Sequence, residues 1–95
     1  MIKGFKSKAL KRYWTKADPS LIRPDQVQRV GLILSVLDTA TKLDDVAAIV
    51  SFAFHPLKGD QKGRYAVKVN ANWRITFGWD QEGTDAIELD LEDYH

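Results

Sequence analysis

The sequence predicts an α+β fold in which two main N-terminal helices pack on an antiparallel sheet. Apolar residues recur every three or four positions in the first half of the chain, as they do on one face of a helix. After residue 64 they alternate with other residues at every second position, and short polar turns separate the alternating runs. Because helices and strands are segregated along the chain, the helices should cover one face of the sheet. We expect residues 1–95 to form one domain.

The composition excludes several classes of protein. The chain is 44% hydrophobic and 28% charged, which is typical of a globular protein rather than a disordered one. The absence of cysteine excludes a disulfide scaffold, a thiolate metal site and a cysteine nucleophile. No apolar run resembles a signal peptide or a membrane span, so we expect a cytoplasmic protein with no membrane contact.

The charges are distributed unevenly, although the net charge is only +1. Residues 1–16 contain six basic and no acidic residues, whereas residues 80–95 contain seven acidic residues and no lysine or arginine. The six basic residues are Lys3, Lys6, Lys8, Lys11, Arg12 and Lys16. This asymmetry indicates either a face for a polyanion or an acidic partner, or pairing of the two ends within the domain.

The first half of the chain predicts an edge strand over residues 2–5 and two helices. In the helix expected over residues 7–17, Leu10, Tyr13, Trp14 and Ala17 recur at helical spacing, and Ser7 is a suitable N-cap. The second helix should span residues 24–40. Its proline at position 24 lacks an N–H that the first turn would leave unpaired. Its apolar stripe, which we assign to the core, comprises Val27, Val30, Ile33, Leu34, Val36 and Leu37.

The segment between the second helix and the sheet is less determined. Thr41 followed by Asp44 resembles a capping box that would begin a short helix. The apolar run 46–54 is consistent with either a turn of helix or an extended segment. Pro56 disfavours helical backbone at His55.

Three alternating runs follow, over residues 65–70, 73–79 and 87–92. A polar turn bracketed by Gly59 and Gly63 leads into the first run, and short turns join the others. Period-two alternation over three neighbouring runs indicates an antiparallel meander with one buried face.

A cluster of basic side chains indicates an anion site. The alternation places Arg74 on the open face of the sheet, with Lys68 available on the neighbouring strand, and an arginine on a rigid strand is a suitable fork for phosphate. Lys58 adds a charge from the preceding loop. Both histidines, His55 and His95, lie at the two ends of this region and are suited to proton transfer near neutral pH. We expect no metal site, because no third ligand stands at a suitable spacing.

These residues alone indicate only a small α+β domain that could bind an anion. Arg74 could equally be a surface arginine paired with Glu88.

Several segments resemble the HigB toxins of the RelE superfamily. They read HPLKGD over 55–60, VNANWRITF over 69–77 and EDYH over 92–95, and the resemblance extends to residues 1–5 and 38–41. It therefore covers nearly the whole chain, and the combination of NWRITF with a terminal DYH is quite specific.

The resemblance implies a toxin of a type II toxin–antitoxin pair that cleaves mRNA on the ribosome and so inhibits translation. It implies a helix-turn-helix, HigA-like antitoxin as partner, with operator DNA bound only through the antitoxin. Residues 7–17 are a candidate antitoxin surface. The candidate catalytic residues that match the family are His55, Lys58, Arg74, Asp93, Tyr94 and His95.

The resemblance also implies a reaction without cofactor or metal, in which the substrate's 2′-OH attacks the adjacent phosphorus. Arg74 and Lys58 would stabilise charge, and His55 and His95 are candidates for proton transfer, with the base and the acid left open. Tyr94 could orient the nucleotide or stack on a base, and Asp93 could orient His95 or take part directly. The alternative is a non-catalytic protein- or nucleic-acid-binding module whose basic first helix docks a partner.

Overall fold

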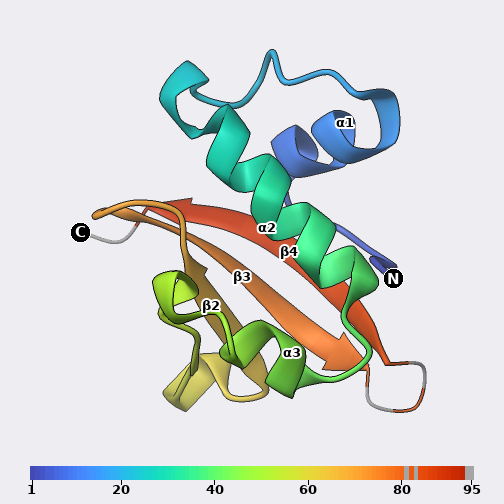
Figure 1. The fold of residues 1–95 in the computed structure, drawn as a ribbon, viewed down its shortest axis with the longest axis vertical. Helices are drawn as coiled ribbons and strands as arrows, with labels where there is room; N and C mark the ends of the chain where they lie inside the picture. The colour runs from blue at the N-terminus through green and yellow to red at the C-terminus, as the bar shows by residue number, and fades with distance from the viewer. Residues whose placement is uncertain (81, 83, 94–95) are drawn as a thin grey trace.

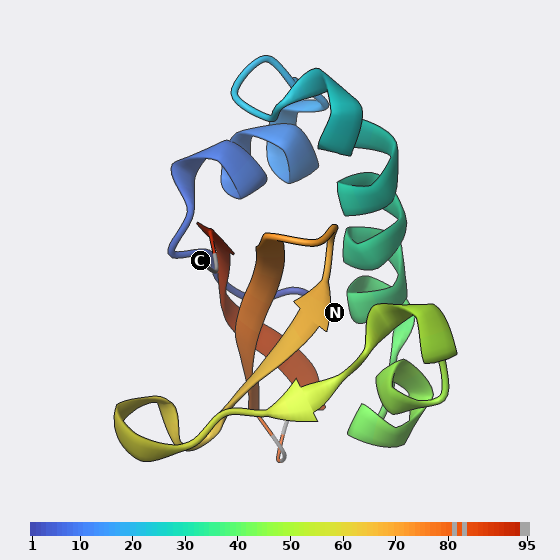
Figure 2. The same cartoon turned by 90° about the vertical axis from the view of Figure 1, so that its left-hand side faces the viewer.

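The computed structural model describes residues 1–80, 82 and 84–93, and its sheet confirms the antiparallel meander (Figure 1). Four strands lie in the order β1-β2-β3-β4, and each pair of neighbours is antiparallel. The bounds of the strands are β1 His55–Pro56, β2 Arg64–Lys68, β3 Trp73–Asp80 and β4 Asp85–Asp93. Helices α1 (Lys8–Lys16) and α2 (Val27–Thr39) lie on one side of this sheet (Figures 1 and 2), which confirms the α+β class.

Helix α1 begins at its predicted cap. The Ser7 hydroxyl accepts a hydrogen bond from the backbone N–H of Leu10 at 3.2 Å, and the helix ends where Ala17 adopts a left-handed conformation with φ of 51°. Leu10 is fully buried, but Trp14 remains 37% exposed. Tyr13 is partly buried and also packs against the core, whereas Trp14 lies at the surface.

Helix α2 supplies the largest part of the core, as its stripe predicted. It follows a turn of 3₁₀ helix, η1 (Pro24–Gln26), and buries Val30, Ile33, Leu34 and Leu37 completely. These side chains join one hydrophobic cluster with residues from all three long strands, including Val67, Ile75, Phe77 and Leu89. Burial of each such side chain is worth about 1.5–3 kcal/mol, so the helix and the sheet stabilise each other.

The undetermined run between α2 and the sheet is a short α-helix followed by a 3₁₀ turn. These are α3 (Leu43–Ala47) and η2 (Val50–Phe52), and Phe52 is fully buried. Two further residues, Ala53 with φ of 47° and His55 at the start of β1, complete the lead-in to the sheet. A further 3₁₀ turn, η3 (Gly59–Gln61), lies in the polar loop between β1 and β2.

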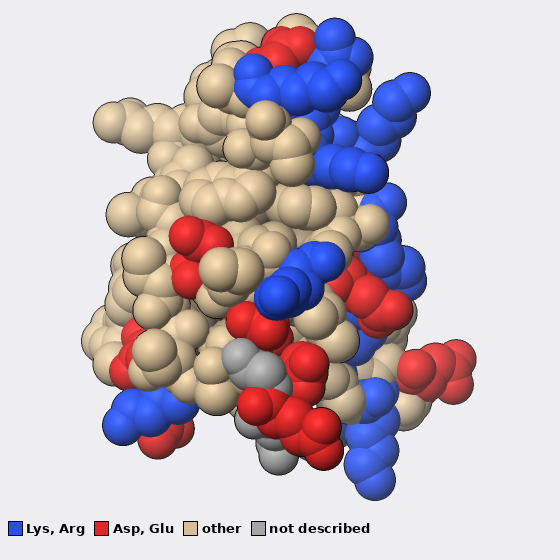
Figure 3. Space-filling view, turned by 90° about the vertical axis from the view of Figure 1, so that its right-hand side faces the viewer, with Lys and Arg blue, Asp and Glu red and all other residues tan. Residues whose placement is uncertain are grey.

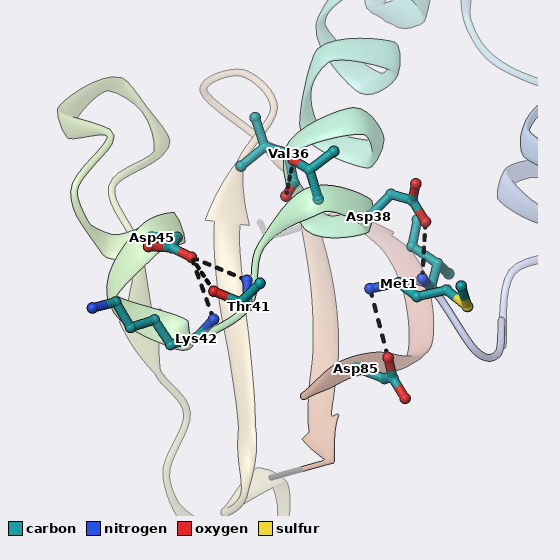
Figure 4. Close-up of polar contacts among 9 residues, drawn as sticks. Met1, Val36, Asp38, Thr41, Lys42, Asp45 and Asp85 are labelled. Atoms are coloured by element: carbon teal, nitrogen blue, oxygen red, sulfur yellow. Dashed lines mark hydrogen bonds and ion pairs between the residues drawn. The ribbon is translucent and has the colours of Figure 1, made fainter. Parts of the chain in front are cut away.

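The predicted cap of α3 was wrong by one residue (Figure 4). The carboxylate of Asp45, not that of Asp44, accepts hydrogen bonds from the backbone N–H of Thr41 at 3.0 Å and of Lys42 at 3.3 Å. Lys42 is the last extended residue before the helix, so the third helical position falls on Asp45. The backbone hydrogen bond from Thr41 is the main reason that the pKa of Asp45 lies below its usual value.

The chain's first residues lie beside its last strand, as the predicted edge strand required. Ile2 forms a parallel bridge with Ala86, and Phe5 forms one with Leu89. The amino group of Met1 lies 3.6 Å from the Asp85 carboxylate (Figure 4). The basic and acidic ends of the chain are therefore neighbours. The basic side chains of α1 nevertheless remain exposed, and Figure 3 shows lysine and arginine gathered above the acidic side chains.

A bulge interrupts the alternation of β4. The register shifts between Thr76 and Gly78, and Glu88 on β4 adopts a left-handed φ of 52°. Ile87 consequently lies opposite Gly78, while Ala86 and Leu89 are the buried residues of this stretch. The predicted placement of Ile87 on the buried face with Leu89 was wrong for this reason. In the part of the chain that the structure describes, no helix is long and apolar enough to cross a membrane.

Candidate functional site

A row of charged side chains crosses the face of the sheet opposite the helices. Lys68 on β2 pairs in register with Arg74 on β3, and Arg74 pairs with Glu92 on β4. Side chains of directly opposed residues lie on the same face of a sheet, about 5 Å apart at Cβ. The structure therefore brings Lys68 and Arg74 together, with one carboxylate beside them.

Arg74 is half-buried and its guanidinium is fixed at the β2–β3 turn. Its Nη1 donates to the backbone carbonyl of Asn70 at 2.7 Å and to that of Trp73 at 3.1 Å. The turn itself is closed by the Asn70 side chain, which accepts from the N–H groups of Asn72 and Trp73, both at 3.0 Å. A cation held by backbone carbonyls of a closed turn is pre-positioned for an anion, as electrostatic catalysis requires.

His55 lies one row further along the same face. It pairs with Ala66 on β2, which in turn pairs with Thr76 on β3, two residues or about 7 Å along the strands from the Lys68–Arg74 row. The ring is exposed, and Nδ1 lies 3.1 Å from the carbonyl oxygen of Ala53. Because a carbonyl can only accept, this hydrogen bond requires the proton on Nδ1, and in the neutral ring with that proton Nε2 is the acceptor.

The structure does not bring Lys58 next to Arg74. Lys58 precedes η3 in the exposed loop that enters β2 at Arg64, whereas Arg74 pairs with Lys68 at the other end of that strand. Those two ends are separated by about 13 Å of extended chain. Figure 2 shows this loop at one end of the sheet and the end of β4 near the other.

The tail residues are placed only in part. Asp93, the last residue of β4, is exposed and lies opposite Trp73, so it belongs to the Arg74 end of the sheet. Tyr94 and His95 lie outside the described residues. Asp93 also helps to line a hollow of about 390 Å³ beside the β2–β3 turn. The other lining residues of this hollow are Arg23, Asp25, Asn70, Ala71, Asn72 and Trp73.

Arg64 is a residue of this face that the sequence pattern missed. Its Nη2 donates to the hydroxyl of Thr76 at 3.2 Å and to the carbonyl of Glu88 at 2.8 Å. Its Nη1 lies 3.4 Å from the Glu88 carboxylate, so the partner considered for Arg74 instead pairs with Arg64. The strand expected from residue 65 begins one residue earlier, and Arg64 continues the spacing of Ala66 and Lys68. This spacing of two residues could have placed Arg64 on the face from the sequence alone.

We expected only the face of the sheet that the helices cover to be buried. The opposite face is also buried at its centre. Thr76 and Ala66 are both fully buried there. Arg64 hydrogen bonds to the Thr76 hydroxyl from one side, and the Thr76 hydroxyl donates to the Glu92 carboxylate at 2.5 Å on the other. The result is a face on which fixed cations, one histidine and ordered carboxylates surround a polar centre. Such an arrangement can hold a phosphate and move a proton beside it.

The family follows from a comparison with known proteins. A model of the RelE-like toxin of the type II toxin–antitoxin system HigB matches residues 3–95. The chain belongs to this family of HigB-like toxins. It is 41% identical over 95 residues to a protein from Proteus vulgaris named endoribonuclease HigB, and the match covers all of both chains.

Solved structures of other proteins share the fold. The YoeB–YefM complex from Staphylococcus aureus has a chain that matches with a TM-score of 0.63 and 17% identity, covering 100% of this chain and 98% of that one. YafQ from E. coli strain BL21(DE3) matches with a TM-score of 0.61 and 10% identity, covering 98% and 93%. At such identities the likeness concerns the fold, and it agrees with helices packed on one antiparallel sheet.

Proposed function

We propose that this HigB-family toxin is an endoribonuclease that cleaves mRNA on the ribosome and so inhibits translation. Membership of the family, and the name of the relative from Proteus vulgaris, support the nuclease activity. The observation that carries the site is the pairing of Lys68 with Arg74 on the face that also presents His55.

The proposed reaction needs no metal. The substrate's 2′-OH attacks the adjacent phosphorus in line, its proton passes to a base, and the leaving 5′-oxygen receives a proton from an acid. Arg74 and Lys68 stabilise the charge that develops on the phosphoryl oxygens. Nε2 of His55 suits the base, because Nδ1 is committed to the Ala53 carbonyl.

The other predicted residues have separate roles in this proposal. The acid comes from the C-terminal residues, with Asp93, Tyr94 and His95 as the candidates; of these, Asp93 lies opposite Trp73 at the Arg74 end of the sheet. Lys58, at the far end of β2, contacts a neighbouring phosphate of the same RNA strand rather than the reacting one. One protein face thereby follows the path of a single strand.

The charge pattern supports dependence on the ribosome. Strand β4 places carboxylates beside the cations of the face: Glu92 lies opposite Arg74, and the Glu88 carboxylate lies 3.4 Å from Nη1 of Arg64. The face is therefore no broad basic groove. Binding of free RNA relies on many phosphate contacts. A nuclease with few such contacts needs another molecule to hold its substrate. In the cytoplasm the ribosome holds the mRNA.

An antitoxin of the helix-turn-helix, HigA-like type is the proposed partner, and operator DNA would be bound through it. The candidate surface is the groove between α1 and α2, where Trp14 is 37% exposed. The groove is lined by Tyr13, Trp14, Ala17, Gln28, Gly31 and Ser35. Lys11 and Lys16 are exposed on the same helix α1, which favours an acidic amphipathic segment.

The exposed basic face of α1 also supports the alternative of a non-catalytic binding module. Cell-free translation with 5′-end mapping of the mRNA separates the two functions. We expect the wild type to cut at codons positioned on the ribosome, and Arg74→Ala to lose these cuts while remaining folded. The control is Arg12→Ala, which removes an exposed arginine of α1. Full cleavage by folded Arg74→Ala contradicts the proposed site, and no cleavage by the folded wild type favours the binding module.

A further inference from the structure

The polar chain that links Arg64, Thr76 and Glu92 has no part in the reaction as proposed above. Its central residue, Thr76, is nevertheless fully buried on the face of the sheet that carries Arg74. Surface threonines of a sheet normally contact water. A fully buried hydroxyl that bonds to two charged groups therefore suggests a specific role for Thr76.

The Thr76 hydroxyl satisfies both of its neighbours at once. It accepts from Nη2 of Arg64 at 3.2 Å and donates to Oε2 of Glu92 at 2.5 Å. A hydroxyl has one donor and two acceptor positions, so these two bonds are compatible. Both bonds are charge-assisted, and bonds of this kind are shorter and stronger than neutral ones.

Glu92 occupies a decisive place on β4. It lies directly opposite Arg74 in the register and immediately precedes Asp93. The bond from Thr76 fixes the position of the Glu92 carboxylate on the strand that also carries Asp93. Thr76 lies two residues from Arg74 on the same strand. The Arg74 side chain and the hydroxyl that holds the Glu92 carboxylate therefore both come from β3.

Arg64 fixes the same strand at a second point. Its Nη2 also donates to the carbonyl of Glu88, the bulge residue with a left-handed φ of 52°. A bulge bends a strand and increases its local twist. By holding this carbonyl with a side chain that is only 14% exposed, Arg64 sets the course of β4 between the bulge and Glu92.

We propose that Arg64 and Thr76 are positioning residues for RNA cleavage, which hold Glu92 and the end of β4 in register with Arg74. The proposal rests on the site assigned above, in which the residues after Glu92 act on a phosphate held by Arg74. Neither Arg64 nor Thr76 needs to touch the RNA. Their effect should therefore fall on the rate of the bound complex and not on its formation.

The test is single-turnover cleavage of mRNA on ribosomes, with the toxin concentration varied to separate the saturating rate from the half-saturating concentration. Thr76→Val keeps the shape of the side chain and removes the hydroxyl. We expect its saturating rate to fall about tenfold or more, since small misplacements of reacting groups cost that much, with the half-saturating concentration unchanged within about twofold. Thr76→Ser restores the hydroxyl and should restore the rate.

Two further variants make the test specific. Glu92→Gln should slow cleavage similarly, and the Thr76→Val/Glu92→Gln double variant should be no slower than the slower single one, because both changes break one unit. Thr39→Val is the matched control, because it removes an exposed threonine hydroxyl at the far end of α2. Thermal unfolding of each variant shows that the protein measured is folded.

Several outcomes overturn the proposal. A folded Thr76→Val that cleaves at the wild-type rate does so, as does a loss that Thr76→Ser fails to restore. A change confined to the half-saturating concentration does so too, because it indicates direct contact with RNA. In each of these cases, loss of cleavage by Arg74→Ala would still support the proposed site. Full activity of Arg74→Ala contradicts the site and the positioning role together.

Discussion

Replacement of Arg29 by methionine tests whether one side chain joins α2 to both the sheet and the segment before His55. The Arg29 guanidinium donates to the carbonyl of Lys68 through Nε at 3.2 Å and Nη2 at 2.9 Å. Nη2 also donates to the carbonyl of Ser51 at 2.7 Å, and the group lies 5.0 Å from the centre of the Phe52 ring. Arg29→Met keeps the apolar stem and removes all of these interactions.

The size of the effect follows from the two carbonyls. Hydrogen bonds to a charged donor contribute about 1.5–3 kcal/mol each. The interaction with the Lys68 carbonyl is partly buried, so the lower end applies to it, and the exposed bond to the Ser51 carbonyl adds about 0–1 kcal/mol. With a cation–π contribution of about 0.5–1 kcal/mol, we expect Arg29→Met to lower the free energy of unfolding by about 2–4 kcal/mol. For a domain of this size that corresponds to a fall in Tm of about 8–30 °C.

The assay is urea unfolding followed by tryptophan fluorescence, with Arg12→Met as the control. Arg12 forms an exposed ion pair with Asp18, and exposed pairs contribute about 0–1 kcal/mol. Arg29→Lys keeps the charge but not the fork, and should give an intermediate loss. If Arg29→Met and Arg12→Met have the same free energy of unfolding, the reasoning is refuted.

Three further predictions concern local features of the fold. Nε2 of Gln26 is buried without a hydrogen-bond partner among residues 1–80, 82 and 84–93, so Gln26→Met should leave the urea midpoint unchanged or raise the free energy of unfolding by about 1 kcal/mol; a clear loss would contradict this. A Cβ at Gly31 would come within 2.7 Å of the Tyr13 hydroxyl, so Gly31→Ala should displace this hydroxyl from the Val27 carbonyl at a cost of about 1 kcal/mol. Alanine gains about 0.8–1 kcal/mol of helix propensity over glycine, so the urea midpoint should stay near that of the wild type, and a clear fall would show that Tyr13 cannot move. The pKa of Asp45 is lowered from 3.8, chiefly by the Thr41 N–H, so the stability that its carboxylate adds is present above pH 3.8 and is lost as the pH falls through the lower folded value. The difference in Tm between wild type and Asp45→Asn should therefore shrink below pH 3.8, and a constant difference would argue against the cap.

The long regular elements could be predicted from the sequence because burial imposes a period on them. The stripe of α2 and the alternation of β3 each place side chains on one packed face, and the pattern records that face. The bulge at Glu88 could not be predicted in this way, because a left-handed residue without glycine leaves no mark in the alternation. Ile87 was consequently assigned to the wrong face.

The candidate site could be predicted only where strand geometry decides it. Arg74 and Lys68 were placed on one face because alternation and a short turn fix their relation. The position of Lys58 relative to Arg74 could not be predicted. Lys58 lies in a loop of seven residues, and a loop has no repeating pattern that shows where its side chains lie. The role of Arg64 depends on its length and its reach to Thr76 and Glu88, which are contacts between strands and not a property of its own neighbours in sequence.

The parallel bridges of Ile2 and Phe5 with β4 have a consequence for the order of events during synthesis. These bridges join residues that lie more than 80 positions apart in the sequence. Contacts between such distant parts of a chain form late in folding, because a large loop must close first. Strand β4 is made after the helices and strands that it packs against, so the four-stranded sheet can form only once residues 85–93 have left the ribosome.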